Sequence, residues 1–315
     1  MNIDPLHRYK GAMIGLAIGD ALGAPLEFLQ RDTFSPVTWY CMGGEFDLAI
    51  GEYTDDSAMA LCLAQSLIDS QGMDQKDQLR KYLLWYEKGY MSATGVRKDC
   101  GITIAKALSH FKREGCSECG DRKFHQGAGN GSLMRIAPVA LFYAADVKLA
   151  MQMAEKSSYT THGLRICADA CRVYTGLIVG ALQGVQKEEL LSESYFKHLC
   201  EVDAKYSYDP LIKRVMQGSY KTKSREDIRS SGYVVDTLEA ALWAFHNSKG
   251  FNEGVLMAVN LGDDADTVGA VYGQLSGAYY GIDGIEKSLR ENVCKSEIIE
   301  SVAEELFTLQ TCKMD

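Results

Sequence analysis

Carboxylates crowd together at two points far apart in the chain, and each group stands directly before a run of small and apolar residues. The first is the TDD sequence at residues 54–56, and the second is the GDDADT sequence at residues 262–267. Either one alone is typical of a helix start, because a threonine oxygen caps free N–H groups and first-turn carboxylates offset the positive end of the helix dipole. If the two starts met, their like charges would raise one another's pKa unless cations neutralised them.

The residues at these two corners offer oxygen ligands, with no histidine or cysteine pair among them. Oxygen ligands suit hard cations such as Mg²⁺, Mn²⁺ or Ca²⁺ and argue against zinc. The sequence therefore predicts a metal site to which both ends of the chain contribute. The candidate ligands are Thr54, Asp55, Asp56, Asp264, Asp266 and Thr267.

Several segments in register with these corners resemble the ADP-ribosylglycohydrolase family. They are GAMIGLAIGDALGAPLEF from residue 11, TDD from 54, GAGNGSLMRIAPVAL from 127, GYVVDTLEAALWAF from 232 and GDDADT from 262. They follow the family's order at about its spacing and span nearly the whole chain. The resemblance implies an all-α fold, a single-domain orthogonal helical bundle over residues 1–315, with a central cleft that holds two divalent cations, Mg²⁺ or Mn²⁺.

The resemblance also implies two candidate acid–base residues, Glu27 and Asp99. Glu27 matches a glutamate that lies beside the metals in relatives, and Asp99 matches an aspartate in the substrate cleft of the arginine-cleaving branch. Spacing alone leaves structural alternatives open. Glu27 could be a solvated carboxylate after the Pro25 turn, and Asp99 could be a helix-capping aspartate. Asp20 belongs to the same signature as Glu27, and for it a structural hydrogen-bonding role is at least as well supported.

The glycine-rich segment from residue 127 offers bare backbone N–H groups that could cradle phosphate oxygens, although such a turn is often only a turn. The resemblance implies an ADP-ribose pocket here. For Arg135 the sequence allows two roles, a partner of the diphosphate or a member of a structural ion pair. His162 matches a position near the ribose, and Tyr233 is open between a cleft residue and a packing residue. The implied ADP-ribose ligands are Gly129, Asn130, Gly131, Ser132, Met134, His162 and Tyr233.

A CxxC pair, Cys116 and Cys119, lies close to His125 and downstream of Cys100. No second CxxC or HxxxH follows at the spacing of a zinc site, so a surface loop is the preferred interpretation. The ten cysteines are scattered through the chain, which indicates buried or free thiols in a reducing cytoplasm.

Composition excludes several classes of protein. A net charge of −9 without a dense basic cluster disfavours nucleic acid as a partner. The N-terminus lacks a secretory pattern, and the apolar run at residues 11–28 is interrupted by Asp20 and Glu27, so neither secretion nor a membrane span is expected. We expect a cytoplasmic protein. The length of 315 residues allows about two domains, but a site built from both ends argues for one.

The expected function is that of a metal-dependent hydrolase that removes ADP-ribose from modified protein side chains, with ADP-ribosyl-arginine as the first choice. The implied partners are an ADP-ribosylated protein and ADP-ribose itself. Two alternatives stay open. One is another linkage, through serine or a nucleotide; the other is an immunity or binding protein that neutralises an ADP-ribosylating toxin.

Overall fold

The structure is a computed structural model that describes residues 3–123 and 127–312. The described residues form α-helices and short 3₁₀ turns, and their only β-type pairing consists of the isolated bridges Gly43–Leu48 and Gly129–Tyr233. Their buried apolar side chains form one core that extends from Tyr9 to Leu306. The expected all-α, single-domain fold is confirmed.

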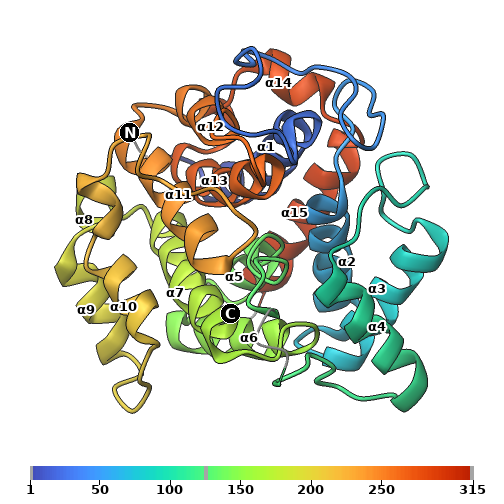
Figure 1. Ribbon diagram of the computed structural model, residues 1–315. Helices are drawn as coiled ribbons and strands as arrows, with labels where there is room; N and C mark the ends of the chain where they lie inside the picture. Colours follow the sequence, from blue (N-terminus) through green and yellow to red (C-terminus); the bar gives the residue numbers. More distant parts are fainter. Residues whose placement is uncertain (1–2, 124–126, 313–315) are drawn as a thin grey trace.

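The helices follow one another along the chain with loops of very different length (Figure 1). Their bounds are α1 Pro5–Gly23, η1 Ala24–Leu26, α2 Asp55–Ser70, α3 Gln75–Lys88, α4 Ile102–Glu114, α5 Ala137–Phe142, α6 Val147–Tyr159, α7 Arg165–Leu182, α8 Lys187–Leu190, α9 Glu193–Glu201, α10 Pro210–Met216, η3 Ser219–Thr222, α11 Val234–Asn247, α12 Phe251–Val259, α13 Ala265–Tyr280, η4 Ile282–Gly284, α14 Lys287–Asn292 and α15 Ser296–Thr311.

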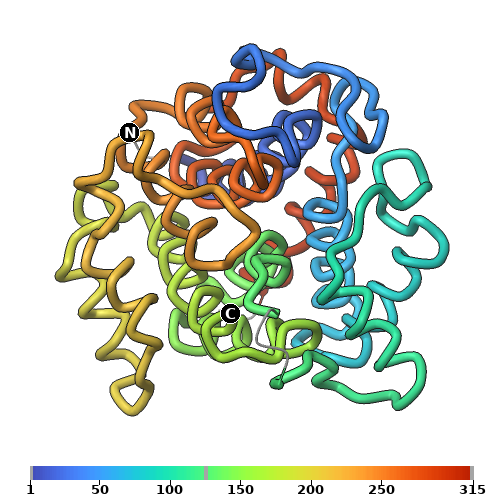
Figure 2. The backbone as a smooth tube through the Cα atoms, viewed as in Figure 1, coloured from blue at the N-terminus to red at the C-terminus, as the bar shows by residue number. Residues whose placement is uncertain are grey.

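Helices α1 and α13 lie side by side and antiparallel at the centre of their neighbours α11, α12, α14 and α15 (Figures 1 and 2). Glycines allow the two backbones to touch. A Cβ atom added at Gly15 would lie 2.4 Å from the Gly273 carbonyl oxygen, and one added at Gly19 would lie 2.0 Å from the Gly269 carbonyl oxygen. The close approach brings Gly23, at the end of α1, against Ala265, at the start of α13. One acidic corner is thereby placed beside the end of α1.

The other acidic corner is held at the same place by Asp20, a fully buried residue of α1. One Asp20 oxygen accepts hydrogen bonds from the Thr54 backbone N–H at 2.9 Å and from the Thr54 hydroxyl at 2.8 Å. The other accepts from the Ser57 N–H at 2.9 Å and from the Ser57 hydroxyl at 2.6 Å. Asp20 thus caps α2 from a neighbouring helix, and its expected structural role is confirmed.

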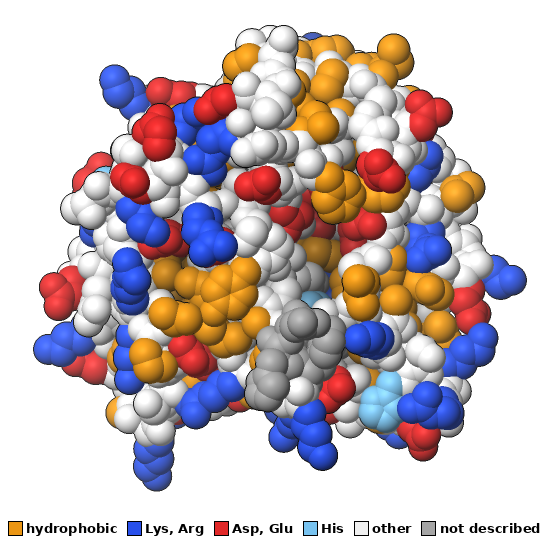
Figure 3. Space-filling model, in the orientation of Figure 1, with side chains coloured by type: hydrophobic (Ala, Val, Ile, Leu, Met, Phe, Trp, Pro, Cys, Tyr) orange, Lys and Arg blue, Asp and Glu red, His pale blue; other side chains and the backbone are white. Residues whose placement is uncertain are grey.

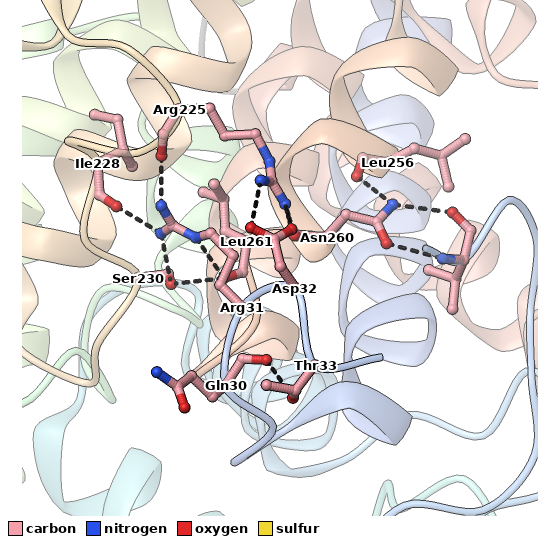
Figure 4. A network of polar contacts seen from close by, with 11 residues as sticks. Gln30, Arg31, Asp32, Thr33, Arg225, Ile228, Ser230, Leu256, Asn260 and Leu261 are labelled. Carbon is pink, nitrogen blue, oxygen red and sulfur yellow. Dashed lines mark hydrogen bonds and ion pairs between the residues drawn. The ribbon is translucent and has the colours of Figure 1, made fainter. Parts of the chain in front are cut away.

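A network centred on Arg31 joins the loops around the second corner (Figure 4). The Arg31 guanidinium donates to the carbonyl oxygens of Leu261 at 3.0 Å and Ile228 at 2.5 Å, and also to that of Arg225. Arg225 in turn forms two hydrogen bonds, of 2.7 and 3.0 Å, with the Asp32 carboxylate. The network fixes the loop after η1 against the end of α12.

The remaining segments lie away from these corners. The polar stretch between residues 186 and 230 forms the short helices α8, α9 and α10 and the turn η3, as expected for peripheral elements. Within the residues that the structure describes, no helix combines the length and the apolar character needed to cross a membrane.

Candidate active site

The two acidic corners meet in one cavity of about 770 Å³. In Figure 3, acidic side chains lie inside the hollow at the centre of the molecule, next to apolar side chains. The hydroxyl of Thr267 donates to an Asp56 carboxylate oxygen at 3.4 Å, which joins the start of α13 to the start of α2. The carboxylates that line the cavity belong to Glu27, Asp55, Asp56, Asp99, Asp263, Asp264 and Asp266.

Burial and mutual repulsion make these carboxylates hard to ionise together. Burial, with the charges of Asp99 and Asp264 added, raises the pKa of Glu27 to about 9. Burial, together with charge from neighbouring carboxylates, also raises the pKa values of Asp55 and Asp266 well above their usual range. Such a set of acids is stable in its ionised form only if a positive charge stands among them.

The oxygen atoms of this cluster fit a divalent cation. Glu27, Asp264 and Asp266 each offer a carboxylate oxygen, and the three atoms lie within 4.8 Å of one another. Buried oxygens of Glu27, Asp56 and Asp266 have no hydrogen-bond partner among the described residues. Unpartnered buried carboxylate oxygens are costly, and an all-oxygen donor set is the kind that Mg²⁺ or Mn²⁺ binds.

Thr54 is the one predicted metal ligand that does not line the cavity among the described residues. It is 2% exposed, and its hydroxyl donates its proton to Asp20. The hydroxyl oxygen keeps a lone pair, but the clearest role of Thr54 in the structure is to connect α1 to the start of α2. The other five predicted ligands, Asp55, Asp56, Asp264, Asp266 and Thr267, all line the cavity.

The raised carboxylate pKa values predict how stability depends on pH without metal. The folded protein holds protons that the unfolded chain releases, because the pKa of Glu27 rises from its usual 4.5 to about 9 on folding. Stability therefore falls as pH rises between these values. Burial lowers the pKa of His162 to about 3, so His162 is neutral in both states above about pH 7 and does not oppose the trend.

We expect the melting temperature of the metal-free protein, measured in chelator by differential scanning fluorimetry, to fall steadily from pH 7 to pH 9. Added Mg²⁺ should raise it most at the alkaline end, because a cation stabilises the ionised carboxylates of the folded state alone. A melting temperature that stays level or rises over this range without metal would show that the carboxylates are not crowded as described.

Asp99 faces the same cavity from the loop before α4, and burial raises its pKa. Its backbone is left-handed, with φ of 56°, as are those of Phe28 at 64° and Asp263 at 56°. Left-handed backbone at residues other than glycine is strained, and it concentrates at functional sites. All three residues line the cavity.

Phe28 and Ile102 are lining residues that sequence reasoning missed. Their side chains are 66% and 71% exposed, which places apolar surface at the mouth of an acidic cavity. Periodicity carries no signal for either residue, since each lies at a junction between a loop and a helix. The position of Phe28 directly after Glu27 is the only indication that the sequence offered.

The glycine-rich segment forms a turn along one wall of the cavity. Gly129, Asn130, Gly131 and Met134 line it, together with His162. The Asn130 amide donates to an Asp264 oxygen at 2.5 Å and to the Thr237 hydroxyl at 2.8 Å. Asn130 therefore ties the turn to the acidic corner as well as to α11.

Two of the expected ADP-ribose ligands, Ser132 and Tyr233, are not among the described residues that line the cavity. Ser132 is 1% exposed, and its hydroxyl accepts a hydrogen bond from Ser158 at 2.8 Å. Tyr233 is half-buried, stands before α11 and pairs with Gly129 in an isolated bridge. Ser132 therefore supports the wall from behind, and Tyr233 is joined to the glycine-rich turn through its backbone.

Neither expectation for Arg135 describes its environment. Its fully buried guanidinium donates to the Gly131 carbonyl oxygen at 2.8 Å and to the Thr161 hydroxyl at 2.6 Å, and lies 4.6 Å from the centre of the Tyr82 ring. It is not among the described residues that line the cavity. Arg135 supports the glycine-rich turn from within the core.

The cysteine expectation is wrong for one pair, because Cys116 and Cys119 form a disulfide in the loop after α4. Cys119 is 2% exposed, so this loop is not entirely at the surface. Other cysteines, including buried Cys62, Cys167 and Cys171, are free thiols as expected. His125 lies outside the described residues.

The sequence profile of the ADP-ribosylglycohydrolase family matches residues 1–314. The chain belongs to this family. This ADP-ribosylglycohydrolase is similar to two proteins named ADP-ribosylarginine hydrolase Tri1. It is 42% identical over 302 residues to that of Pseudomonas putida (strain GB-1), across 96% of this chain and 78% of the relative. It is 38% identical over 307 residues to that of Serratia proteamaculans (strain 568), across 96% of this chain and 80% of the relative.

The fold of this ADP-ribosylglycohydrolase also matches a solved structure described as an ADP-ribosylglycohydrolase-related protein complex. The TM-score is 0.84 at 39% sequence identity, and the match covers 97% of this chain and 99% of the other. Sequence and fold therefore agree on the family along the whole described chain.

Proposed function

We propose that this protein hydrolyses the glycosidic bond between ADP-ribose and an arginine side chain of a modified protein. The observation that carries the proposal is the meeting of the two acidic helix starts in one cavity that Asp99 also faces. The two relatives named ADP-ribosylarginine hydrolases support arginine as the acceptor.

The acidic corners would hold two divalent cations, Mg²⁺ or Mn²⁺, through Asp55, Asp56, Asp264, Asp266 and Thr267, with Thr54 at the edge of the set. Bound there, the cations would supply positive charge that binds the ribose hydroxyl oxygens and lowers the pKa of a water molecule. Cleavage at the anomeric carbon passes through an oxocarbenium-like state, which needs the ribose held in place and a proton moved to the leaving group.

Glu27 and Asp99 are the groups of this chain that fit proton transfer. Both face the cavity, and burial raises the pKa of each, so that either exchanges a proton more readily near neutral pH than an exposed carboxylate does. Glu27 lies within 4.8 Å of carboxylate oxygens of Asp264 and Asp266, and Asp99 interacts with Asp55 from the loop before α4. We assign Asp99 to the leaving group, because a carboxylate on that loop suits the acceptor proposed for this protein.

A carboxylate at Asp99 suits a guanidinium leaving group. Guanidinium is planar and cationic, so that a carboxylate can accept two of its N–H groups in a fork and hold it aligned while the bond breaks. The apolar side chains of Phe28 and Ile102 at the mouth fit the aliphatic part of an arginine side chain. A serine linkage has no guanidinium for Asp99 to hold and no long aliphatic chain to contact Phe28 and Ile102.

We expect Asp99→Asn to lower the rate of ADP-ribose release from an arginine-modified protein by about 100-fold or more, the range for loss of a positioned catalytic group. Metal content and affinity for free ADP-ribose should stay close to wild type, because the shape of the side chain is kept. The assay is single-turnover release of ADP-ribose, run in parallel on arginine- and serine-linked peptides.

Asp47→Asn is the matched control, since Asp47 is an exposed aspartate with a left-handed backbone (φ of 48°) that does not line the cavity. It should release ADP-ribose at the wild-type rate. Normal cleavage by Asp99→Asn would remove this residue from the mechanism. A wild type that prefers the serine linkage would move the assignment to the alternative specificity.

A cytoplasmic location and an ADP-ribosylated target protein complete the proposal. The free buried thiols agree with a reducing compartment, whereas the Cys116–Cys119 disulfide does not. Neutralisation of an ADP-ribosylating toxin would use the same cavity if the protein reverses the modification that the toxin makes. The release assay on a toxin-modified target therefore tests this second role with the same readout.

A further inference from the structure

A chain of three buried polar groups connects the core to the wall of the cavity. The Arg135 guanidinium donates to the Thr161 hydroxyl oxygen at 2.6 Å, and the same oxygen lies 2.8 Å from Nδ1 of His162. Arg135 and Thr161 are fully buried, and His162 is 1% exposed. His162 alone of the three lines the cavity.

The hydrogen bonds among Arg135, Thr161 and His162 favour one tautomer of His162. Arginine is always a donor, so the Thr161 oxygen must accept from Arg135. If Nδ1 of His162 also carried a proton, the Thr161 oxygen would accept twice and its own buried proton would have no partner, which is costly for a buried donor. When the Thr161 hydroxyl donates to Nδ1 instead, the Thr161 proton and Nδ1 both have a partner. Nδ1 is then an acceptor, and the ring proton is on Nε2.

The protonated nitrogen lies on the cavity side, beside the glycine-rich turn. A Cβ atom added at Gly131 would lie 3.2 Å from Nε2 of His162, and one added at Gly129 would lie 3.6 Å from it. The ring is neutral, because burial and the nearby charge of Arg135 lower the pKa of His162 to about 3. The cavity wall thus presents an N–H donor whose protonation does not change near neutral pH.

We propose that Arg135 and Thr161 are positioning residues that fix His162 as the Nε2–H tautomer, so that His162 donates a hydrogen bond to an oxygen of the bound ADP-ribosyl group. The identity of the ligand rests on the proposed function, whereas the tautomer rests on the three side chains alone. Arg135 also donates to the Gly131 carbonyl oxygen at 2.8 Å, so one guanidinium holds both the ring and the turn that leaves space for it.

The first test is the ¹⁵N spectrum of the imidazole nitrogens in the ligand-free wild-type protein, with the His162 signals assigned by their loss in His162→Gln. We expect a protonated Nε2 and an unprotonated Nδ1 that keep their shifts from pH 6 to pH 8. A protonated Nδ1 would overturn the proposed tautomer whether or not the protein binds ADP-ribose.

The second test compares Thr161→Val, which removes the hydroxyl at nearly constant shape, with Thr161→Ser, which keeps it. Thr161→Val should lose the fixed Nε2–H tautomer and bind ADP-ribose about tenfold more weakly, because about 1.4 kcal/mol, the order of one hydrogen bond, corresponds to a factor of ten. Thr161→Ser should restore both properties, which a role in packing alone would not explain. Wild-type affinity in Thr161→Val would overturn the proposal.

Parallel titrations with ADP and with ADP-ribose identify the accepting oxygen. An equal loss for both ligands in Thr161→Val places the hydrogen bond on a phosphate, and a loss for ADP-ribose alone places it on the distal ribose; either result supports the proposal. If the wild type binds neither ligand, the donor role of His162 and the proposed function both fail. The ¹⁵N spectrum still reports separately on the tautomer of His162.

Discussion

Replacing Asp266 by asparagine should lower turnover by about 1,000-fold, within the range for loss of a group essential to the chemistry. Asp266 lies in the first turn of α13 and is 2% exposed, and one of its buried carboxylate oxygens has no partner among the described residues. An amide keeps the shape but removes the charge that would hold a divalent cation. Turnover and metal content, the latter by mass spectrometry of the metal, should be lost together.

The same variant should become more stable in the absence of metal. Burial and the charges of Glu27 and Asp264 raise the pKa of Asp266 well above its usual range, so the metal-free site destabilises the fold. Asp266→Asn relieves that repulsion, and the melting temperature in chelator should rise while the increase produced by Mg²⁺ disappears. Losing activity while gaining metal-free stability is the mark of a charge kept for function.

Asp77→Asn is the control for this experiment. Asp77 is also a first-turn aspartate, but it accepts hydrogen bonds from Ser66 and Lys81 and lies outside the cavity. Its replacement should leave the Mg²⁺ response and turnover intact and lower stability slightly. An Asp266→Asn protein that retains metal and turnover would contradict the assignment of Asp266.

Gly19→Ala should cause a large loss of stability, because the added methyl group has no room between two helix backbones. The new Cβ would lie 2.0 Å from the Gly269 carbonyl oxygen, a backbone atom that cannot move without separating α1 from α13. Overpacking of a close helix contact costs typically 1–3 kcal/mol, and here we expect about 3 kcal/mol or more in the free energy of unfolding, measured in urea.

Gly250→Ala provides the comparison. Its added Cβ would meet no atom within 4 Å, and its backbone is extended, with φ of −162°. We expect a change within about 0.5 kcal/mol, as for an unremarkable surface substitution. Because α1 holds the start of α2 through Asp20 and packs against α13, it positions both acidic corners, and Gly19→Ala should also weaken Mg²⁺ binding in any fraction that folds. Equal stability of the two variants would show that the backbones do not touch.

The centre of the fold could be predicted because its signals are local and redundant. The aspartates before each apolar run mark helix starts. Sequence spacing did not show that α13 is the partner of α1, since the match of four-residue glycine steps on two distant helices is visible only once both are placed. The prediction of an all-α fold rested on the family resemblance.

The details of the cavity wall could not be predicted for a physical reason. In a turn such as that of residues 127–135, no periodicity determines which side chains face a ligand, so Ser132 and Met134 looked alike although only Met134 lines the cavity. For Arg135 the sequence left both a diphosphate partner and a structural ion pair open, because a cation in a glycine-rich segment suits either role. Its partners, Gly131 and Thr161, are brought to it by tertiary structure.

If the two acidic corners form one metal site for hydrolysis of ADP-ribosyl-arginine, cleavage must depend on Mg²⁺. The decisive experiment measures ADP-ribose released from an arginine-modified peptide at increasing Mg²⁺, starting from chelator-treated enzyme, with a serine-modified peptide as the reference. We predict no release in chelator, recovery with Mg²⁺ along the same curve as the thermal stabilisation, and preference for the arginine linkage. Full release in chelator, or release from the serine peptide alone, would contradict this assignment.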